Sequence, residues 1–270
     1  MHILFFDSGL GGLTVHGPVH AARRDARITY LADDAVFPYG GLGEAELVAR
    51  VMEVIGAEVA RDPPDIIVNA CNTASTLVLP HLRARFAMPV VGTVPAIKPA
   101  AASSTSRMFS VMATPGTVRR DYTRDLVDTF AGGCEVALVP CVRLAALAEA
   151  ALRGDCVPDA EILAEMAPAF VEKAGRRTDT VVLACTHYPL LLERMKALAP
   201  WPVAWVDPGP AIAKRVVQLI GDMPAGAVAA GEGRMVFTSG RAPGATLEQA
   251  LAARGLVCDR LSTRDLAQDR

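Results

Sequence analysis

The chain has 270 residues, of which 51% are hydrophobic, and its formal net charge is −2. This length suits two domains of ordinary size, and the near-neutral charge without a Lys/Arg cluster excludes a protein that binds nucleic acid through a basic surface. No stretch approaches the roughly 20 consecutive apolar residues of a membrane span, and Met1–Phe6 lacks the basic segment of a signal peptide. We therefore expect a soluble, cytoplasmic protein with no membrane and no nucleic-acid partner.

Short apolar runs alternate with helical periods in the first third of the chain. Strands are predicted at His2–Phe6, Ile28–Ala32, Asp65–Asn69 and Pro89–Thr93, and helices at Glu44–Arg61 and from about Ala74 to Phe86. The Gly-rich turn after the first strand does not fit the dinucleotide fingerprint, because Thr14 stands where a further glycine is needed. The segment from Asp33 to Gly41 contains two acids, a proline and a glycine pair and is predicted to be a loop.

The same alternation continues after Pro95, where we expect the chain to cross into a second domain. Further strands are predicted at Met108–Ala113, Glu135–Val139, Thr180–Ala184, Val203–Val206, Met235–Thr238 and Leu256–Cys258. Further helices are predicted from Thr117 to about Phe130, after Cys141, from Asp159 to Lys173 with a bend at Pro168, from Leu190 to Leu198, from Asp207 to Ile220 and from Thr246 to Arg254.

Strands that alternate with helices predict an α/β fold. We expect two similar, pseudo-symmetric domains with mainly parallel sheets flanked by helices, and an active site in the cleft between them. The first domain would comprise residues 1–96 plus 208–270 and carry Cys71. The second would comprise residues 97–207 and carry Cys185.

Two matching segments carry the clearest chemical signal. Thr180–Leu190 reads T-V-V-L-A-C-T-H-Y-P-L and Asp65–Ser75 reads D-I-I-V-N-A-C-N-T-A-S, so each is an apolar strand that ends in alanine, cysteine and two polar residues. The chain has six cysteines but no CxxC pair, so neither a disulfide framework nor a zinc site is indicated. Cys71 and Cys185 stand apart through their matching surroundings, and the other four are interpreted as small buried residues.

Two thiols in matching positions on two domains favour one kind of reaction. A cysteine that opens a helix is stabilised as thiolate by the helix N-terminus. If one thiolate removes a proton from a carbon and the other thiol returns a proton to the opposite face, the stereocentre is inverted. Pyridoxal phosphate is not indicated, because none of the four lysines follows an evident phosphate-binding loop. A cofactor-independent amino-acid racemase without a metal fits these residues best.

Four short motifs together resemble those of a known family. They are Asp7-Ser8-Gly9, Pro38-Tyr39-Gly40, Ala70-Cys71-Asn72-Thr73-Ala74 and Cys185-Thr186-His187-Tyr188-Pro189. In this order they are similar to the motifs of the glutamate racemases, the cofactor-independent enzymes of the aspartate/glutamate racemase superfamily. The similarity covers most of the chain and thins after about Asp207.

This resemblance implies roles for particular residues. Cys71 and Cys185 would be the catalytic acid/base groups, assisted by Asp7 and His187. The glutamate site would be lined by Asp7, Ser8, Tyr39, Gly40, Asn72, Thr73, Thr186 and His187. Glu149, eight residues after Cys141, matches a family glutamate that assists catalysis, and Thr117 in its Gly-Thr-Val turn would contact the substrate. The family further implies a homodimer that supplies D-glutamate for peptidoglycan, and hence for cell wall biogenesis and cell shape.

Two departures from the family and three other hypotheses accompany this interpretation. Asp34 stands where many relatives have threonine, and Phe37 stands where some have a small residue, which would alter the cleft wall.

An aspartate or hydantoin racemase, or a related decarboxylase, is disfavoured by His187 and by the presence of both cysteines. A Cys–His acyl-transfer hydrolase using Cys185 and His187 leaves Cys71 unexplained. A non-catalytic α/β binding protein leaves both motifs unexplained.

Overall fold

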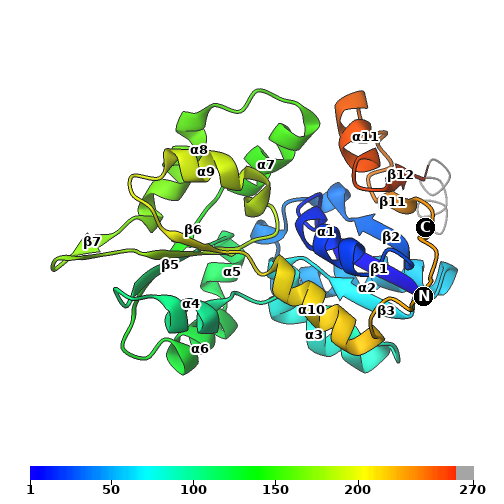
Figure 1. The fold of residues 1–270 in the computed structure, drawn as a ribbon, viewed down its shortest axis with the longest axis horizontal. Coiled ribbons are helices and arrows are strands. Elements are labelled where there is room, and N and C mark those ends of the chain that lie inside the picture. The colour runs from blue at the N-terminus through cyan, green and yellow to red at the C-terminus, as the bar shows by residue number, and fades with distance from the viewer. Residues whose placement is uncertain (260–270) are drawn as a thin grey trace.

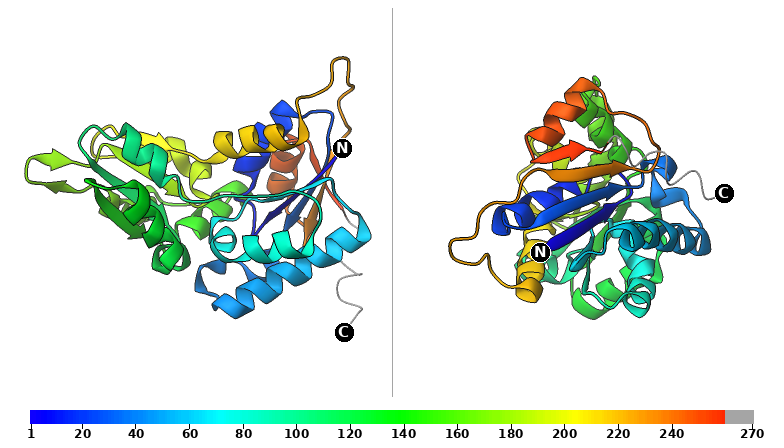
Figure 2. Two further views of the ribbon diagram at one scale, coloured as in Figure 1. Left: turned by 90° about the horizontal axis from the view of Figure 1, so that it is seen from below. Right: turned by 90° about the vertical axis from the view of Figure 1, so that its right-hand side faces the viewer.

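The computed structural model describes residues 1–259, which form two lobes that are each built on a parallel sheet (Figure 1). The larger sheet has six strands in the order β12-β11-β2-β1-β3-β4, and the smaller has four in the order β10-β9-β5-β6. Helices cover both faces of each sheet, as Figure 2 also shows. The predicted α/β fold with two parallel, helix-flanked sheets is therefore confirmed.

The first lobe contains the N-terminal third of the chain and the C-terminal part of the described residues. Its strands are β1 (His2–Asp7), β2 (Arg27–Ala32), β3 (Ile66–Asn69), β4 (Val90–Gly92), β11 (Gly233–Phe237) and β12 (Leu256–Cys258). Its helices are α1 (Leu13–Ala22), α2 (Glu44–Arg61), α3 (Asn72–Arg85), α10 (Gly209–Ile220) and α11 (Ala245–Ala252), with 3₁₀ turns η1 (Asp34–Val36) and η2 (Tyr39–Gly41).

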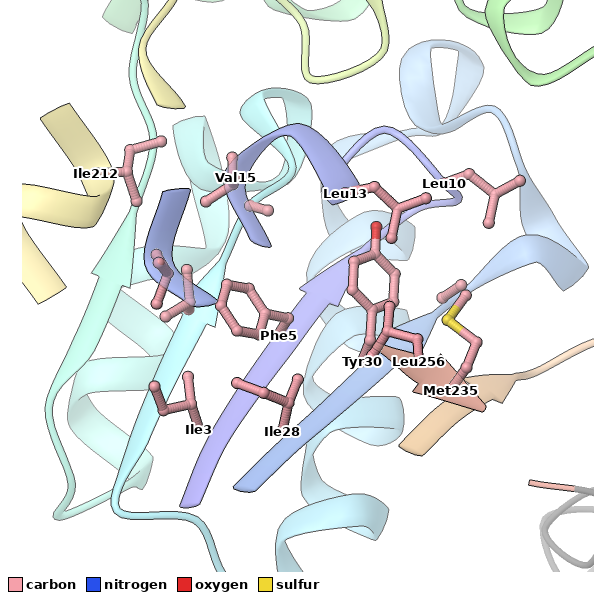
Figure 3. Close-up of a cluster of buried hydrophobic side chains, with 14 of the residues drawn as sticks. Ile3, Phe5, Leu10, Leu13, Val15, Ile28, Tyr30, Ile212, Met235 and Leu256 are labelled. Carbon is pink, nitrogen blue, oxygen red and sulfur yellow. The ribbon is translucent and has the colours of Figure 1, made fainter. Parts of the chain in front are cut away.

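Strand β1 lies inside this sheet, and both of its faces are covered. Ile3 and Phe5 point to the face where α1, α10 and α11 pack, whereas Leu4 and Phe6 point to the face covered by α2 and α3. Figure 3 shows Ile3, Phe5 and Tyr30 on the first of these faces, on the same side as Ile212 of α10. Because the strand is buried on both sides, residues 3–6 in its middle are all apolar, which explains why its sequence does not alternate.

The second lobe comes from the middle of the chain. Its strands are β5 (Met108–Ala113), β6 (Glu135–Pro140), β9 (Thr180–Ala184) and β10 (Ala204–Val206), and a separate antiparallel hairpin joins β7 (Glu172–Lys173) to β8 (Arg176–Arg177). Its helices are α4 (Ile97–Ser103), α5 (Pro115–Arg119), α6 (Asp121–Phe130), α7 (Leu144–Arg153), α8 (Asp159–Met166) and α9 (Leu192–Leu198), with 3₁₀ turns η3 (Ala167–Ala169) and η4 (Tyr188–Leu191).

The strands are distributed between the sheets in a way that supports the predicted domains. The larger sheet takes its strands from residues 2–92 and 233–258, and the smaller from residues 108–206. The domain boundaries themselves stay a prediction. Residues 260–270 of the first predicted domain lie outside the described residues. Within residues 1–259, no helix is long and apolar enough to cross a bilayer.

The structure differs from the prediction in three helical segments. The helix predicted from Asp159 to Lys173 ends at Met166, because Pro168 lacks an N–H to continue it, and the chain then enters the β7–β8 hairpin. The helix predicted from Thr117 is two helices separated by the extended residue Arg120, and its N-cap is Thr114, whose Oγ1 accepts from the Thr117 N–H at 3.3 Å. Helix α4, in a stretch of small residues, was not predicted.

One buried histidine of α1 makes the fold sensitive to acid. His16 is 1% exposed, its ring stacks on that of His20 at 5.3 Å, and neither of its ring nitrogens has a hydrogen-bond partner within residues 1–259. Burial, together with the positive charges of His20 and Arg254, lowers the pKa of His16 to about 3. The folded protein therefore keeps this imidazole neutral where the unfolded chain already binds a proton.

We expect this histidine to destabilise the fold as the pH falls through the range between its unfolded and folded pKa values. Between about pH 7 and about pH 4, His16 should lower the free energy of unfolding by roughly 3 kcal/mol. Urea unfolding at a series of pH values should show less acid sensitivity in His16→Phe than in the wild type. His81→Gln, at an exposed histidine of α3, is the control and should follow the wild type. Equal pH dependence in all three proteins would contradict the prediction.

Candidate active site

Both cysteine motifs lie where a central strand of a sheet ends. Cys71 follows β3, which pairs with β1, and Cys185 follows β9, which pairs with β5. The carboxyl ends of neighbouring parallel strands are where open α/β sheets place their ligands. The two cysteines are 4% and 6% exposed, so the side chains that surround them determine their chemistry.

Cys71 is held as a neutral thiol. It is the N-cap of α3, and its Sγ lies 3.7 Å from the Ser8 hydroxyl oxygen. Burial raises the pKa of Cys71 to about 12, and the negative charges of Asp7 and Cys185 contribute to the rise. The turn with Ser8 also connects Cys71 to the Cys185 motif, because Ser8 follows Asp7, whose Oδ2 accepts the Thr186 hydroxyl at 3.0 Å.

Cys185 has a cation beside it instead of a carboxylate. His187 Nδ1 lies 3.8 Å from its Sγ, and His187 Nε2 lies 3.0 Å from Glu149 Oε1 of α7. Burial would lower the pKa of His187, but hydrogen bonds to Cys185 and Glu149 and the charge of Asp7 hold that pKa well above its usual value. An imidazolium in this position stabilises a thiolate at Cys185.

Glu149 is an ionised carboxylate inside the protein. Burial alone would raise its pKa, but His187, the Leu10 N–H and Arg153 together lower it. Leu10 donates to Oε1 at 2.5 Å, and Arg153 Nη2 donates to Oε2 at 3.1 Å. The structure thus brings Glu149 directly onto His187, although the two residues come from different elements of the second lobe.

The Gly-rich turn after β1 packs against the second lobe. A Cβ atom on Gly9 would lie 2.3 Å from Glu149 Oε1, and one on Gly11 would lie 2.4 Å from His187 Nδ1 and 2.5 Å from Thr186 Oγ1. These distances are too short for any side chain. The glycines therefore allow the two lobes to approach closely. This explains why the turn is rich in glycine although it does not fit the nucleotide fingerprint.

His187 Nε2 has two neighbours that suit different protonation states. The Gly11 N–H lies 3.1 Å from Nε2 and can donate only to a neutral nitrogen, whereas Glu149 Oε1 accepts from a protonated one. The presence or absence of a proton on Nε2 therefore decides which of these two bonds can form.

A second contact between the lobes lies at Asp7. Thr186 donates its hydroxyl to Asp7 Oδ2 at 3.0 Å, and the Gly9 N–H donates to Oδ1 at 3.0 Å. Burial raises the pKa of Asp7 to about 6, and the nearby His187 together with these two hydrogen bonds opposes the rise. The carboxyl group is completely buried and can change its charge near neutral pH.

Three threonines form a corresponding contact on the other side of the site. Thr73 Oγ1 lies 2.9 Å from Thr114 Oγ1 and 3.3 Å from Thr117 Oγ1. Gly40 packs against the same turn, because a Cβ added to it would lie 3.2 Å from Thr114 Cβ. The structure thus brings Thr73, Thr117 and Gly40 together. Thr114 was missed by sequence reasoning, although its place directly after a strand could have indicated it.

Tyr39 is buried near Cys71, but its hydroxyl bonds to a fixed partner. It donates to Asp33 Oδ2 at 2.5 Å, and Asp33 also accepts from Arg50 Nη2 at 2.6 Å and from Thr238 Oγ1 at 2.6 Å. Asp34, the departure from the family, accepts from the Ser239 N–H at 2.9 Å. These bonds anchor the loop that carries Tyr39 and Gly40 to the end of β11.

Asn72 retains a free donor. Its Oδ1 accepts from the Thr93 hydroxyl at 3.4 Å, while its buried Nδ2 has no hydrogen-bond partner within residues 1–259. A buried amide N–H₂ without an acceptor is unfavourable unless a ligand or water supplies one. Asn72 is therefore suited to bind an oxygen atom of a substrate.

Comparisons with known proteins agree with this arrangement. A family model described as Asp/Glu/Hydantoin racemase matches residues 20–216. A glutamate racemase from Brucella ovis is 54% identical over 219 residues, which cover 81% of this chain and 79% of that protein. The glutamate racemase of Escherichia coli, solved in complex with L-glutamate and the activator UDP-MurNAc-ala, has a TM-score of 0.86 at 37% identity and covers 95% of this chain and 96% of that one.

A more distant structure gives the same result. The glutamate racemase from Aquifex pyrophilus has a TM-score of 0.69 at 29% identity, and the match covers 94% of each chain. Since the family model spans most of the sequence and a curated relative is identical at more than half of the aligned positions, this chain belongs to the Asp/Glu/hydantoin racemase family and, within it, to the glutamate racemases.

Proposed function

We propose that this glutamate racemase interconverts L-glutamate and D-glutamate by moving the α-proton between Cys71 and Cys185. The observation that carries the proposal is the position of the two thiols, each at the end of a central strand of a different sheet and each next to the contact between Asp7-Ser8 and Thr186. Two opposed acid/base groups are what inversion at a carbon requires.

The surroundings of the two sulfurs suggest which one begins as the base. Cys71 lies beside the Asp7 carboxyl and keeps its proton, while Cys185 lies beside the protonated His187. The Cys185 thiolate would take the α-proton from the enantiomer whose Cα–H bond faces it. The Cys71 thiol would then give its proton to the opposite face, which leaves Cys71 as thiolate and Cys185 as thiol for the reverse reaction.

The remaining residues would bind glutamate and stabilise the negative charge that develops at its α-carbon. The helix N-terminus at Cys71 and the free Nδ2 of Asn72 supply donors for a carboxylate. The hydroxyls of Ser8, Thr73 and Thr186 lie in the same region. We infer that these groups, with Tyr39, Gly40 and Thr117, surround the substrate, and that no cofactor takes part.

Glutamate is favoured over the substrates of other family members. The curated relative from Brucella ovis and the structural neighbour from Escherichia coli are both glutamate racemases, so an aspartate or hydantoin racemase is not favoured. The product, D-glutamate, supplies peptidoglycan synthesis, and we propose that the enzyme works in the cytoplasm. A homodimer also stays a prediction, which light scattering of the purified protein would test.

A single experiment tests the activity. The protein is incubated with L-glutamate in deuterated water while the optical rotation and the α-proton signal are recorded. We expect both signals to decline. A parallel reaction that starts from D-glutamate should reach the same racemic mixture. Aspartate and hydantoins, tested in parallel, should react far more slowly. If L-glutamate keeps both its rotation and its α-proton, the proposed function is wrong.

A further inference from the structure

Phe37 lies in the loop between η1 and η2 of the first lobe, but its side chain packs against the second lobe. The half-buried ring contacts the hydrophobic cluster that contains Cys185, Tyr188 and Met195. All other described members of this cluster come from residues 112–205, so Phe37 is the one described residue that the first lobe contributes to it. The side chain therefore connects the loop before Tyr39 to the surroundings of Cys185.

The ring of Phe37 packs against the ring of His187. The two ring centroids are 5.2 Å apart, and the ring planes are inclined by 44°. Gly9 lies at the same point, since a Cβ added to it would be 3.2 Å from Phe37 Cδ2 and 3.2 Å from His187 Nε2. The ring of Phe37 and the glycine turn thus both pack against the imidazole.

Charged and titratable groups surround the edge of this imidazole. Cys185, at the end of β9, lies 3.8 Å from Nδ1, and Glu149 of α7 lies 3.0 Å from Nε2 with Arg153 paired behind it. Asp7 of β1 adds a further negative charge. Phe37 contributes an apolar, uncharged wall to this environment, which otherwise consists of partners for a cation.

We propose that Phe37 is a positioning residue of the racemase, whose ring holds the imidazole of His187 against Cys185 and excludes water from that pair. The proposal rests on the function proposed above. The face of an aromatic ring attracts a cation, and an ion pair is stronger where water is excluded. Because Tyr39 and Gly40 follow in the same short loop, the binding of substrate and the covering of His187 would be coupled.

The test measures thiolate formation at Cys185 without substrate. Thiolate absorbance near 240 nm is recorded against pH in Cys71→Ser, and the signal of Cys71→Ser/Cys185→Ser is subtracted, so that only Cys185 contributes. Adding Phe37→Ala should raise the midpoint of this titration by about one pH unit, and adding Phe37→Leu by about half a unit. Phe37→Tyr keeps an aromatic face and should restore the wild-type midpoint.

Kinetics with both cysteines present provide the second measurement. Phe37→Ala and Phe37→Leu should lower kcat roughly tenfold and change KM less, because the loss concerns the reactive pair and not the binding of substrate. Phe170→Leu is the matched control, since Phe170 is a half-buried ring of the same cluster that packs on Trp201 at 5.4 Å. It should change neither the titration nor kcat.

Two results would overturn the proposal. One is a wild-type titration midpoint in both Phe37→Ala and Phe37→Leu, whatever happens to kcat. The other is an equal shift in Phe170→Leu, which would mean that general loosening of the cluster and not the contact with His187 is responsible. Since the titration needs no substrate, its outcome is independent of whether glutamate is racemised. Phe37→Leu keeps most of the side-chain volume and covers the case in which Phe37→Ala does not fold.

Discussion

Replacing either Cys71 or Cys185 by serine is expected to reduce racemisation of glutamate by roughly 10²- to 10⁴-fold. A serine hydroxyl is a far weaker acid than a thiol, so each variant loses one of the two groups that exchange the α-proton. The effect should fall mainly on kcat, because the substituted side chain keeps nearly the same shape. Circular dichroism measures the rate, starting from each enantiomer in turn.

The same two variants would also show which cysteine serves which enantiomer. Each retains one thiol, which can still remove a proton from the face that it reaches and return deuterium from the solvent to the same face. We expect each variant to exchange the α-proton of one enantiomer without inverting it, and the two variants to prefer opposite enantiomers. Cys156 is exposed, so its interpretation as a small buried residue was wrong, and Cys156→Ser serves as the control that should racemise normally. Near-normal turnover in Cys71→Ser or in Cys185→Ser would refute the two-thiol mechanism.

Gly11→Ala is expected to lower kcat by roughly 10²-fold, because displacing catalytic groups by about 1 Å is enough for such a loss. The new methyl group would lie 2.4 Å from His187 Nδ1 and 2.5 Å from Thr186 Oγ1, so the two lobes must separate or His187 must turn away from Cys185. Steady-state kinetics with L-glutamate and with D-glutamate measure the effect.

A glycine of the neighbouring helix provides the matched control for this variant. Gly17 lies on the exposed side of α1, and a Cβ added there meets no described atom within 4 Å. Gly17→Ala should leave kcat nearly unchanged and alter stability by less than about 1 kcal/mol. If Gly11→Ala were as active as Gly17→Ala, the close approach of the glycine turn to His187 would have no importance for catalysis.

Local sequence signals were sufficient for most of the helices and strands. The helix at Glu44–Arg61 has the predicted bounds, because an apolar period runs through it and Asp62-Pro63-Pro64 ends it. The strands Met108–Ala113 and Thr180–Ala184 also match, since both are mainly apolar and lie inside a sheet. Errors occurred where a proline or a small-residue stretch left the periodicity ambiguous, as in the β7–β8 hairpin and α4.

The candidate site was predicted only in part for the same physical reason. Two strand-to-cysteine motifs are local patterns, so Cys71, Cys185 and their neighbours could be selected from the sequence, and their catalytic roles stay predictions. Thr114 and Asp33 carry no such pattern. Their significance comes from contacts with Thr73 and Tyr39, which lie on other elements.

The sequence by itself determined the alternation of strands and helices, the parallel sheets that follow from it and the presence of two equivalent cysteines, because each depends on residues close together in the chain. The tertiary structure alone decided how the two cysteines differ. Asp7 reaches Thr186, and Glu149 reaches His187, through contacts between distant segments, so one thiol lies beside a carboxyl group and the other beside an imidazolium. Desolvation and charge depend on what surrounds a group in space, and neither can be read from its neighbours in the chain.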